Sequence, residues 1–237
     1  FNSVTIGKGA NSVSNNTVVG ESALDGSVTG DYNTVVGKYG GTNLTTGAYN
    51  TVLGYNSLAD ATTASNNTAV GNLALKANVA SNNTAVGYDA LKSNTTGTLN
   101  TAVGSAALDN NTTGGSNTAM GTNALGVNST GDDNTAFGKS ALSDSTTAIQ
   151  NTAVGALAAD AITTGNYNTA VGYNAMSAAT TGTFNMAFGN QAMGGGVVTG
   201  SRNTACGNSA LYDLTTGADN VGVGDDSLTN LTTGAYN

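Results

Sequence analysis

The sequence contains no histidine, proline or tryptophan, and charged residues make up only 8% of its 237 positions. Without histidine, neither a Ser-His-Asp triad nor a histidine-ligated zinc site can form. The one cysteine, Cys206, excludes internal disulfides and four-cysteine zinc sites. The glycine motifs also lack the Lys-Ser or Lys-Thr ending of a phosphate-binding loop. The sequence therefore predicts no catalytic, cofactor-binding or metal-binding residue, and no enzyme activity.

Basic residues are equally scarce. Six Lys and Arg stand against fourteen Asp and Glu, which gives a net charge of −8. Binding to a phosphate backbone needs a basic surface, so nucleic acid is not an expected partner. The apolar runs are a few residues long, too short to cross a bilayer, and residues 1 to 30 lack the regions of a signal peptide. We expect no membrane span.

Two pairs of adjacent acids come closest to a reactive arrangement. Asp132-Asp133 and Asp225-Asp226 carry the groups used in general acid-base catalysis and in Ca²⁺ binding. Neighbouring carboxylates in loops are most often only solvated, and we interpret both pairs in that way.

A regular repeat dominates the sequence. The segment Asn-Thr-Ala-Val-Gly, or a close variant, recurs along the chain with a period of about 17 residues. Ten of the thirteen spacings between its closing glycines are identical, and the interval from Gly7 to Gly20 is the shortest. These glycines are Gly7, Gly20, Gly37, Gly54, Gly71, Gly87, Gly104, Gly121, Gly138, Gly155, Gly172, Gly189, Gly207 and Gly224. Such a period indicates stacked copies of one small structural unit.

A unit of this length, with a short alternating β-branched run and glycine at both ends, is typical of one coil of a parallel β-solenoid. Helical repeats generally need about 30 residues or more. The sequence thus predicts an all-β parallel β-roll or β-solenoid with about 17 residues per coil, about 14 coils, and one continuous repeat region over residues 1–237. Because Thr232 to Asn237 duplicate Thr45 to Asn50, we expect a fragment of a longer fibre.

Positions in a coil are counted from the closing glycine, and equivalent positions form columns. Position −1 is Val, Leu, Met, Phe or Cys, position −2 is mostly Ala, and position +4 is mostly Leu. Neighbouring strand residues point to opposite faces. We expect the −1 and +4 columns to fill the interior, which would bury Cys206, and the −2 alanines to form a smooth outer face for another chain. A coil with so little core predicts an oligomer.

Two further columns have expected structural roles. Glycine at −7, replaced by Ala64, Ala80 and Ala148, is predicted to supply the positive φ of a tight corner. Asparagine at −4, from Asn16 to Asn220, is predicted to hydrogen-bond from coil to coil.

Tyrosines follow the repeat as well. Tyr32, Tyr49, Tyr167 and Tyr236 precede the asparagine column, whereas Tyr55, Tyr88 and Tyr173 follow the closing glycine. We expect them to pack at corners or between chains, with stacking on sugar rings as the alternative for exposed ones.

The strand motifs resemble those of known fibre proteins. Ser3-Val4-Thr5-Ile6-Gly7 and Asn16-Thr17-Val18-Val19-Gly20 resemble the head repeats of YadA-type trimeric autotransporter adhesins. Units such as residues 83–91 resemble repeats of phage tail-fibre shafts and of surface proteins that end in an endosialidase-type chaperone. Met186, Val221 and Tyr39-Gly40-Gly41 depart from the pattern.

This resemblance spans nearly the whole chain and implies a left-handed β-roll in which three parallel copies form a homotrimer. It further implies a structural or adhesive shaft, extracellular, on a virion tail fibre or a cell surface, with a host-surface glycan or receptor as possible partner. Two alternatives stay open: a monomeric β-solenoid that binds ice, through its Thr-Thr pairs, or glycan, and a solenoid polysaccharide depolymerase. The near-identity of the coils argues against the depolymerase, which needs one special acidic cleft.

Overall fold

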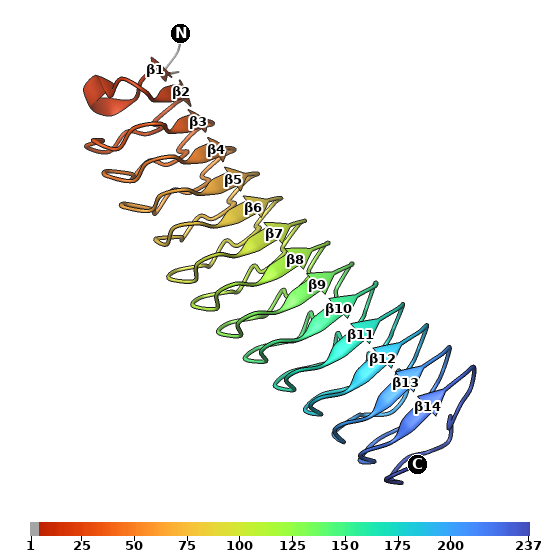
Figure 1. Ribbon diagram of the computed structural model, residues 1–237. Coiled ribbons are helices and arrows are strands. Elements are labelled where there is room, and N and C mark those ends of the chain that lie inside the picture. Colours follow the sequence, from red (N-terminus) through yellow and green to blue (C-terminus); the bar gives the residue numbers. More distant parts are fainter. Residues whose placement is uncertain (1–4) are drawn as a thin grey trace. The chain divides into compact units, whose positions relative to one another are not determined.

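The computed structural model describes residues 5–237, and the chain divides after Ser116 into two compact units. Both units are built from the same repeated coil (Figure 1). The first unit contains β1 (Thr5–Gly7), a 3-10 turn (Ala10–Ser12), β2 (Thr17–Gly20), β3 (Thr34–Val36), β4 (Thr51–Leu53), β5 (Thr68–Val70), β6 (Thr84–Val86) and β7 (Thr101–Val103). The second contains β8 (Thr118–Met120), β9 (Thr135–Phe137), β10 (Thr152–Val154), β11 (Thr169–Val171), β12 (Met186–Phe188), β13 (Thr204–Cys206) and β14 (Val221–Val223).

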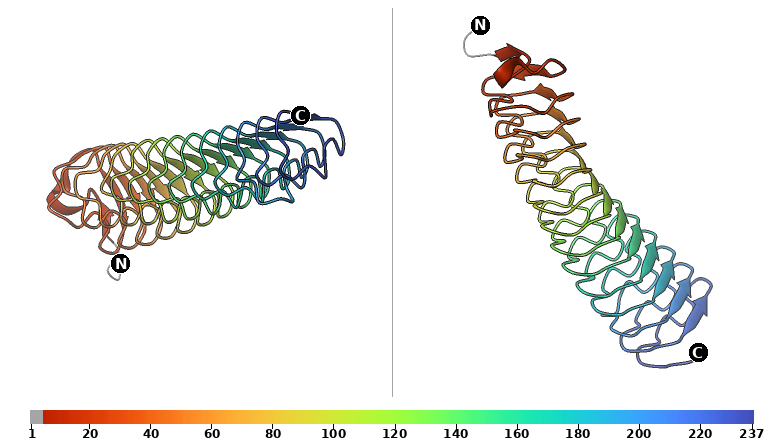
Figure 2. Two further views of the ribbon diagram at one scale, coloured as in Figure 1. Left: turned by 90° about the horizontal axis from the view of Figure 1, so that it is seen from below. Right: turned by 60° about the vertical axis from the view of Figure 1, so that its left-hand side comes forward.

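Strands of successive coils pair in parallel and in register within each unit. In the second unit Ala153 lies opposite Ala170, and in the first Ala69 lies opposite Ala85. Figure 2 shows the same coil outline repeating along each unit. The predicted all-β parallel β-solenoid is confirmed, and so is its period, because strand partners in most coils stand one repeat apart in sequence. That all 237 residues form one continuous repeat region stays a prediction.

The first strand departs from this pattern, so the expectation of a parallel coil at every repeat is wrong there. β1 pairs antiparallel with β2, with Ile6 opposite Val19. The interval from Gly7 to Gly20 is shorter than a full coil. We attribute the reversal to this short interval, because the chain turns back through Ala10–Ser12 before it completes a circuit.

The +4 column lies in the interior as predicted. Its side chains are fully buried in nearly every coil: Leu24, Leu58, Leu75, Leu91, Leu108, Leu125, Leu142, Met176, Met193 and Leu211. In the coil that has Gly41 instead, the space at that position is bordered by Leu24, Val35 and Leu44. The departure at Tyr39-Gly40-Gly41 is therefore compensated by neighbouring side chains.

The expected orientation of the strands was wrong. The −2 alanines, such as Ala153 and Ala170, are fully buried, whereas the larger −1 side chains point outward, with Phe188 57% exposed. Cys206 is likewise exposed rather than buried. The physical reason is volume: the +4 side chain fills much of a narrow interior, so position −2 from β2 to β14 holds only alanine, valine or glycine, and Leu, Met and Phe stand at −1 outside.

The asparagine column joins the coils as predicted. The Oδ1 atom of Asn168 accepts the backbone N–H of Asn185 at 2.9 Å, and its Nδ2 donates to the carbonyl of Gly182 at 2.8 Å. The same arrangement recurs in the first unit at Asn33, with Asn50 and Gly47. These amides satisfy backbone groups that the turn before each strand would otherwise leave buried and unpaired.

Glycine serves two different purposes in the coil. Closing glycines adopt a φ that L side chains rarely adopt, such as 134° at Gly172. The −7 glycines do not have a left-handed φ, so that prediction is wrong. At Gly47 an added Cβ would lie 2.1 Å from the carbonyl oxygen of Ala64, so close contact between coils is what requires glycine there.

Candidate functional site

The outward side of the strands forms the first candidate surface, which we call the strand face and define by positions −3 and −1. Side chains alternate along a strand, so burial of position −2 places both neighbours on the outside. Position −1 carries one apolar residue per coil: Ile6, Val19, Val36, Leu53, Val70, Val86 and Val103 in the first unit, then Met120, Phe137, Val154, Val171, Phe188, Cys206 and Val223 in the second.

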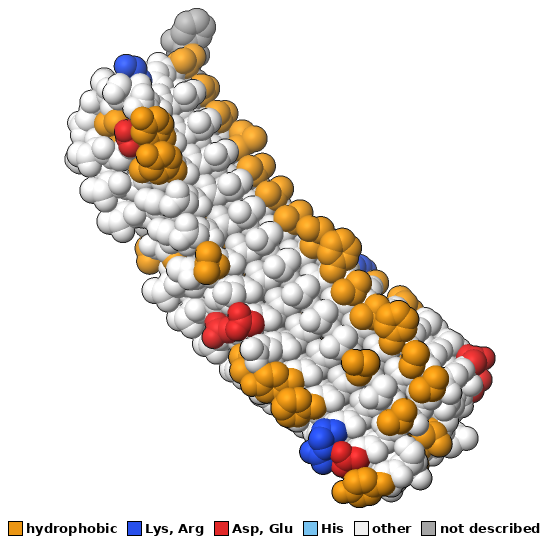
Figure 3. All heavy atoms as spheres, in the orientation of Figure 1, with side chains coloured by type: hydrophobic (Ala, Val, Ile, Leu, Met, Phe, Trp, Pro, Cys, Tyr) orange, Lys and Arg blue, Asp and Glu red, His pale blue; other side chains and the backbone are white. Residues whose placement is uncertain are grey.

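The strand face is uncharged, and its −1 column is apolar. From β2 to β14, position −3 is threonine except at Met186 and Val221. The exposed fractions reach 52% at Phe137 and 67% at Val223. Figure 3 shows apolar side chains gathered along the strand edge of the units. A continuous apolar column of this kind is typical of a contact surface.

Position −5 forms the second candidate surface, which we call the −5 ridge. Its residues turn a corner with a left-handed backbone, φ being 60° at Tyr167 and 58° at Phe184. The backbone N–H of Phe184 donates to the carbonyl of Asn166 in the previous coil at 3.1 Å. The corner is thus fixed by backbone hydrogen bonds, and its side chain projects to solvent.

Aromatic side chains stack along this ridge. Tyr167 and Phe184 lie with ring centroids 4.7 Å apart and an interplanar angle of 4°. Tyr32 and Tyr49 form a similar pair in the first unit, at 5.0 Å and 4°. Tyr167 is 44% and Phe184 56% exposed, so the ridge tyrosines lie at corners as predicted, with their rings largely in solvent, and their packing between chains stays a prediction.

An ion pair continues the ridge in the second unit. Arg202 follows Phe184 at position −5, and its Nη2 atom donates to Oδ2 of Asp219 at 2.8 Å, while Nε donates to Oδ1. This hydrogen bonding between Arg202 and the Asp219 carboxylate lowers the pKa of Asp219 and raises the pKa of the Arg202 guanidinium. Tyr236 ends the series and is 83% exposed.

Sequence reasoning identified the tyrosines of this ridge but missed Phe184, Arg202 and Asp219. The signal that identifies them is their position, since all three stand at −5 in successive coils. Tyr88 and Tyr173, at +1, are also exposed, at 55% and 54%.

Most basic side chains are paired with an acid of an adjacent coil. Besides Arg202, Lys38 lies 2.9 Å from Glu21 and Lys76 lies 3.1 Å from Asp60. Lys92 contacts both Asp89, at 3.1 Å, and Asp109, at 3.2 Å, and these hydrogen bonds raise its pKa. Such pairs leave little free positive charge on the surface.

The acid pairs singled out in the sequence lie on the outside of the coil. Asp132, Asp133, Asp225 and Asp226 are all exposed, and Asp225 accepts a hydrogen bond from Nδ2 of Asn208 at 2.9 Å. Within residues 5–237, no group of three or more His, Cys, Asp or Glu side chains is placed to hold a metal ion.

Asp160 is an acid whose pKa is raised by its surroundings. Burial raises its pKa, and the nearby charge of Asp144 adds to this effect. Because the pKa of Asp160 is higher in the folded than in the unfolded protein, its protonated carboxyl favours the fold at pH values below the unfolded pKa. This contribution is lost as the pH rises through the folded pKa.

Asp160→Asn is therefore expected to raise the Tm at pH 7 by about 1 °C, because it removes a charge that the fold disfavours. At pH 3, below the ordinary pKa of an aspartate, Asp160 is largely protonated in both states, and the difference in Tm should nearly vanish. Thermal unfolding followed by circular dichroism at both pH values measures this difference. An equal shift at pH 3 and pH 7 would contradict the electrostatic explanation.

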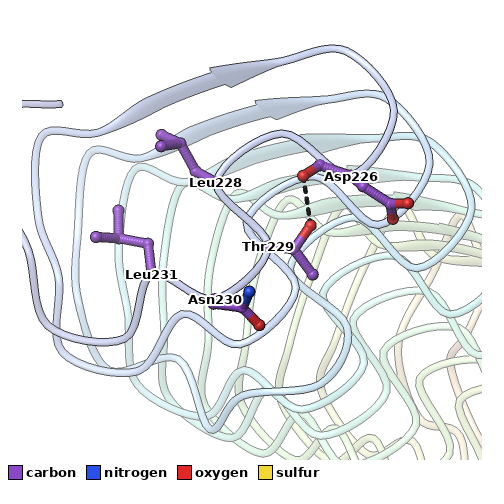
Figure 4. A pocket seen from close by; sticks show the side chains of 5 residues that line it. All are labelled: Asp226, Leu228, Thr229, Asn230 and Leu231. Carbon is purple, nitrogen blue, oxygen red and sulfur yellow. Dashed lines mark hydrogen bonds between the residues drawn. The ribbon is translucent and has the colours of Figure 1, made fainter.

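A hollow of about 730 Å³ opens at the last described coil, lined by Asp226, Leu228, Thr229, Asn230 and Leu231 (Figure 4). The Thr229 hydroxyl donates to the backbone carbonyl of Asp226. Leu228 is 37% exposed, whereas the equivalent Leu211 is fully buried beneath the following coil. The hollow thus corresponds to the interior volume that the following coil covers at Leu211.

No helix in residues 5–237 is long and apolar enough to cross a membrane. Comparison of the chain with protein-family models, with curated proteins and with solved structures finds no match.

Proposed function

We propose that this chain forms the shaft of an extracellular fibre, on a virion or a cell surface, and that parallel copies associate through their strand faces. The observation that carries the proposal is the apolar −1 column of each unit, whose side chains point outward and are half-buried or exposed in coil after coil. Exposed apolar side chains in a continuous row are costly in water, and covering them with a second molecule removes that cost.

The repeat itself favours another copy of the same chain as the covering molecule. The −1 side chains recur once per coil, at the spacing of about 4.8 Å between neighbouring strands. A second copy has the same spacing, so one favourable contact is repeated at every coil. The number three, and the adhesive role at a host surface, come from the resemblance to trimeric fibre repeats.

Assembly of this kind predicts a mass of about three times 23.1 kDa by light scattering. Phe188→Asp, combined with Val154→Asp, should reduce the mass to that of one chain, because each carboxylate would be buried unpaired in the interface. Both side chains point outward, so the coil itself should stay folded by circular dichroism. Thr181→Asp, which adds charge at an exposed position outside the strand face, is the matched control.

Cys206 provides a second readout of the same arrangement. It is the only cysteine and lies on the strand face between Phe188 and Val223. If copies pack in parallel and in register, mild oxidation should link two chains through Cys206, and the Phe188→Asp, Val154→Asp variant should not form this link. A monomeric unaltered chain, or crosslinking that the variant retains, would overturn the proposed interface.

The strand face also favours one alternative, an ice-binding monomer. Threonine at −3 stands beside valine at −1 on the same flat face, as at Thr152 and Val154. The Thr-Thr pairs are less suited, because the first hydroxyl often donates to the next coil, as in the 3.3 Å bond from Thr163 to the carbonyl of Thr180. Thermal hysteresis in a monomeric preparation would support this alternative.

The expected absence of enzyme activity stays a prediction. The depolymerase alternative would require new reducing ends on incubation with capsular glycans, and their loss on substitution of Asp132 or Asp225.

A further inference from the structure

The composition of the −5 ridge is not explained by the fold. Asn66 and Gln150 occupy the same position with the same backbone, at φ 59° and 56°, and make the same backbone hydrogen bond to the previous coil. The corner therefore forms equally well with a polar side chain. Tyr167, Phe184 and Tyr236 expose large apolar surface at a position where the coil does not need it.

We propose that the −5 ridge of the second unit, from Tyr167 to Tyr236, binds an uncharged oligosaccharide. The proposal deepens the adhesive role given to the shaft above and rests on that proposed function, although the site itself lies within one chain.

The ridge presents the two kinds of group that sugars need. The stacked rings of Tyr167 and Phe184 offer rigid apolar surface on which the C–H face of a pyranose ring can lie, and Tyr236 offers another. Between them, the planar Arg202–Asp219 pair combines donor and acceptor atoms suited to adjacent hydroxyl groups. Figure 3 shows apolar, basic and acidic side chains side by side near the end of the chain.

Electrostatics favours an uncharged ligand. Asp219 neutralises Arg202, which makes the ridge locally neutral, and the chain as a whole carries a net charge of −8. Anionic glycans would meet repulsion without a free cation to bind them. The ridge also projects outward, whereas proline-rich peptides bind in grooves between aromatic side chains.

The spacing of the ridge suits a chain of sugars rather than one sugar. Its five residues stand in successive coils, about 4.8 Å apart, so the distance from Tyr167 to Tyr236 corresponds to several linked pyranose units. Contact with more than one ring compensates for the weak binding of each.

Affinity electrophoresis of the full 237-residue chain tests the proposal. Native gels would contain dextran, yeast mannan, xylan or galactan as neutral probes, with heparin as an anionic probe, and a polyproline peptide would be titrated separately. We expect retardation by at least one neutral polysaccharide, and a roughly tenfold weaker retardation for Phe184→Ala. Tyr173→Ala, which removes an equally exposed aromatic ring outside the ridge, should bind like the unaltered chain.

Arg202→Gln provides a second variant, because it removes the charge pair and leaves the rings in place. It should also weaken retardation while circular dichroism stays unchanged. Binding to none of the neutral probes, stronger binding to heparin or polyproline, or equal loss in Phe184→Ala and Tyr173→Ala would each overturn the proposal.

The outcome is separate from the test of assembly. A trimer that no neutral glycan retards would overturn the sugar site and leave the shaft standing. A monomer that is retarded through Phe184 would support the sugar site and overturn the fibre.

Discussion

Replacing Gly172 with alanine is expected to lower the free energy of unfolding by about 4 kcal/mol or more. Gly172 closes β11 at φ 134°, and an added Cβ would lie 2.4 Å from the carbonyl oxygen of Gly189 and 2.6 Å from its carbon. Both atoms belong to the backbone of the next coil, which is fixed by the strand ladder and cannot move aside alone. Urea unfolding followed by circular dichroism would measure the loss.

Gly126→Ala is the matched control for this prediction. An added Cβ there would meet the Asn123 amide side chain, at 2.3 Å, and that side chain is exposed and able to rotate away. We expect a loss below about 1 kcal/mol. Equal losses in Gly172→Ala and Gly126→Ala would show that contact between closing glycines does not set the distance between coils.

Asn168→Ala should produce the second large effect, a loss of about 3 kcal/mol in the free energy of unfolding. Asn168 is 1% exposed, and its amide both accepts the N–H of Asn185 and donates to the carbonyl of Gly182. Removing the amide leaves both groups buried without that partner, at about 1 to 3 kcal/mol each. The change should appear as a lower Tm and as faster hydrogen exchange at Asn185.

Asn190→Ala is the control for the asparagine column. Asn190 is exposed, and its bond to Asn208, at 2.8 Å, lies in contact with solvent. Its removal should change stability by less than about 0.5 kcal/mol. If Asn168→Ala were equally harmless, the internal amide column would not be a major source of stability.

Those features of the fold that depend on residue type alone could be predicted from the sequence. Leucine at +4 must find an apolar interior, and an asparagine repeated once per coil matches the spacing of stacked backbone groups. Both columns lie where the pattern predicted. The period, together with the short alternating strand, was enough to predict the parallel solenoid.

The direction of the strand side chains could not be predicted, because strand alternation says that −1 and −2 differ but not which is inside. Judging by hydrophobicity alone would bury Phe188 and Val154, whereas the narrow coil places the smaller neighbours Ala187 and Ala153 in the interior. That decision depends on interior volume, which a one-dimensional pattern does not contain. The antiparallel pairing of β1 likewise depends on how far the short segment between Gly7 and Gly20 can reach.

The candidate surfaces were only partly predictable for the same reason. The sequence identified an apolar column and a set of tyrosines, but the outward direction of the column made it a contact surface instead of a core. The −5 ridge became visible only when Phe184, Arg202 and Asp219 were placed in one line with Tyr167.

Register has a consequence for how such a protein can change in length. Since each residue pairs with its equivalent one period away, removal or duplication of a whole period joins chemically matching ends and preserves every type of neighbour. A partial period would instead set leucine opposite threonine and separate the amides. The length of such a protein can therefore be adjusted in discrete steps of one coil, without any new packing arrangement.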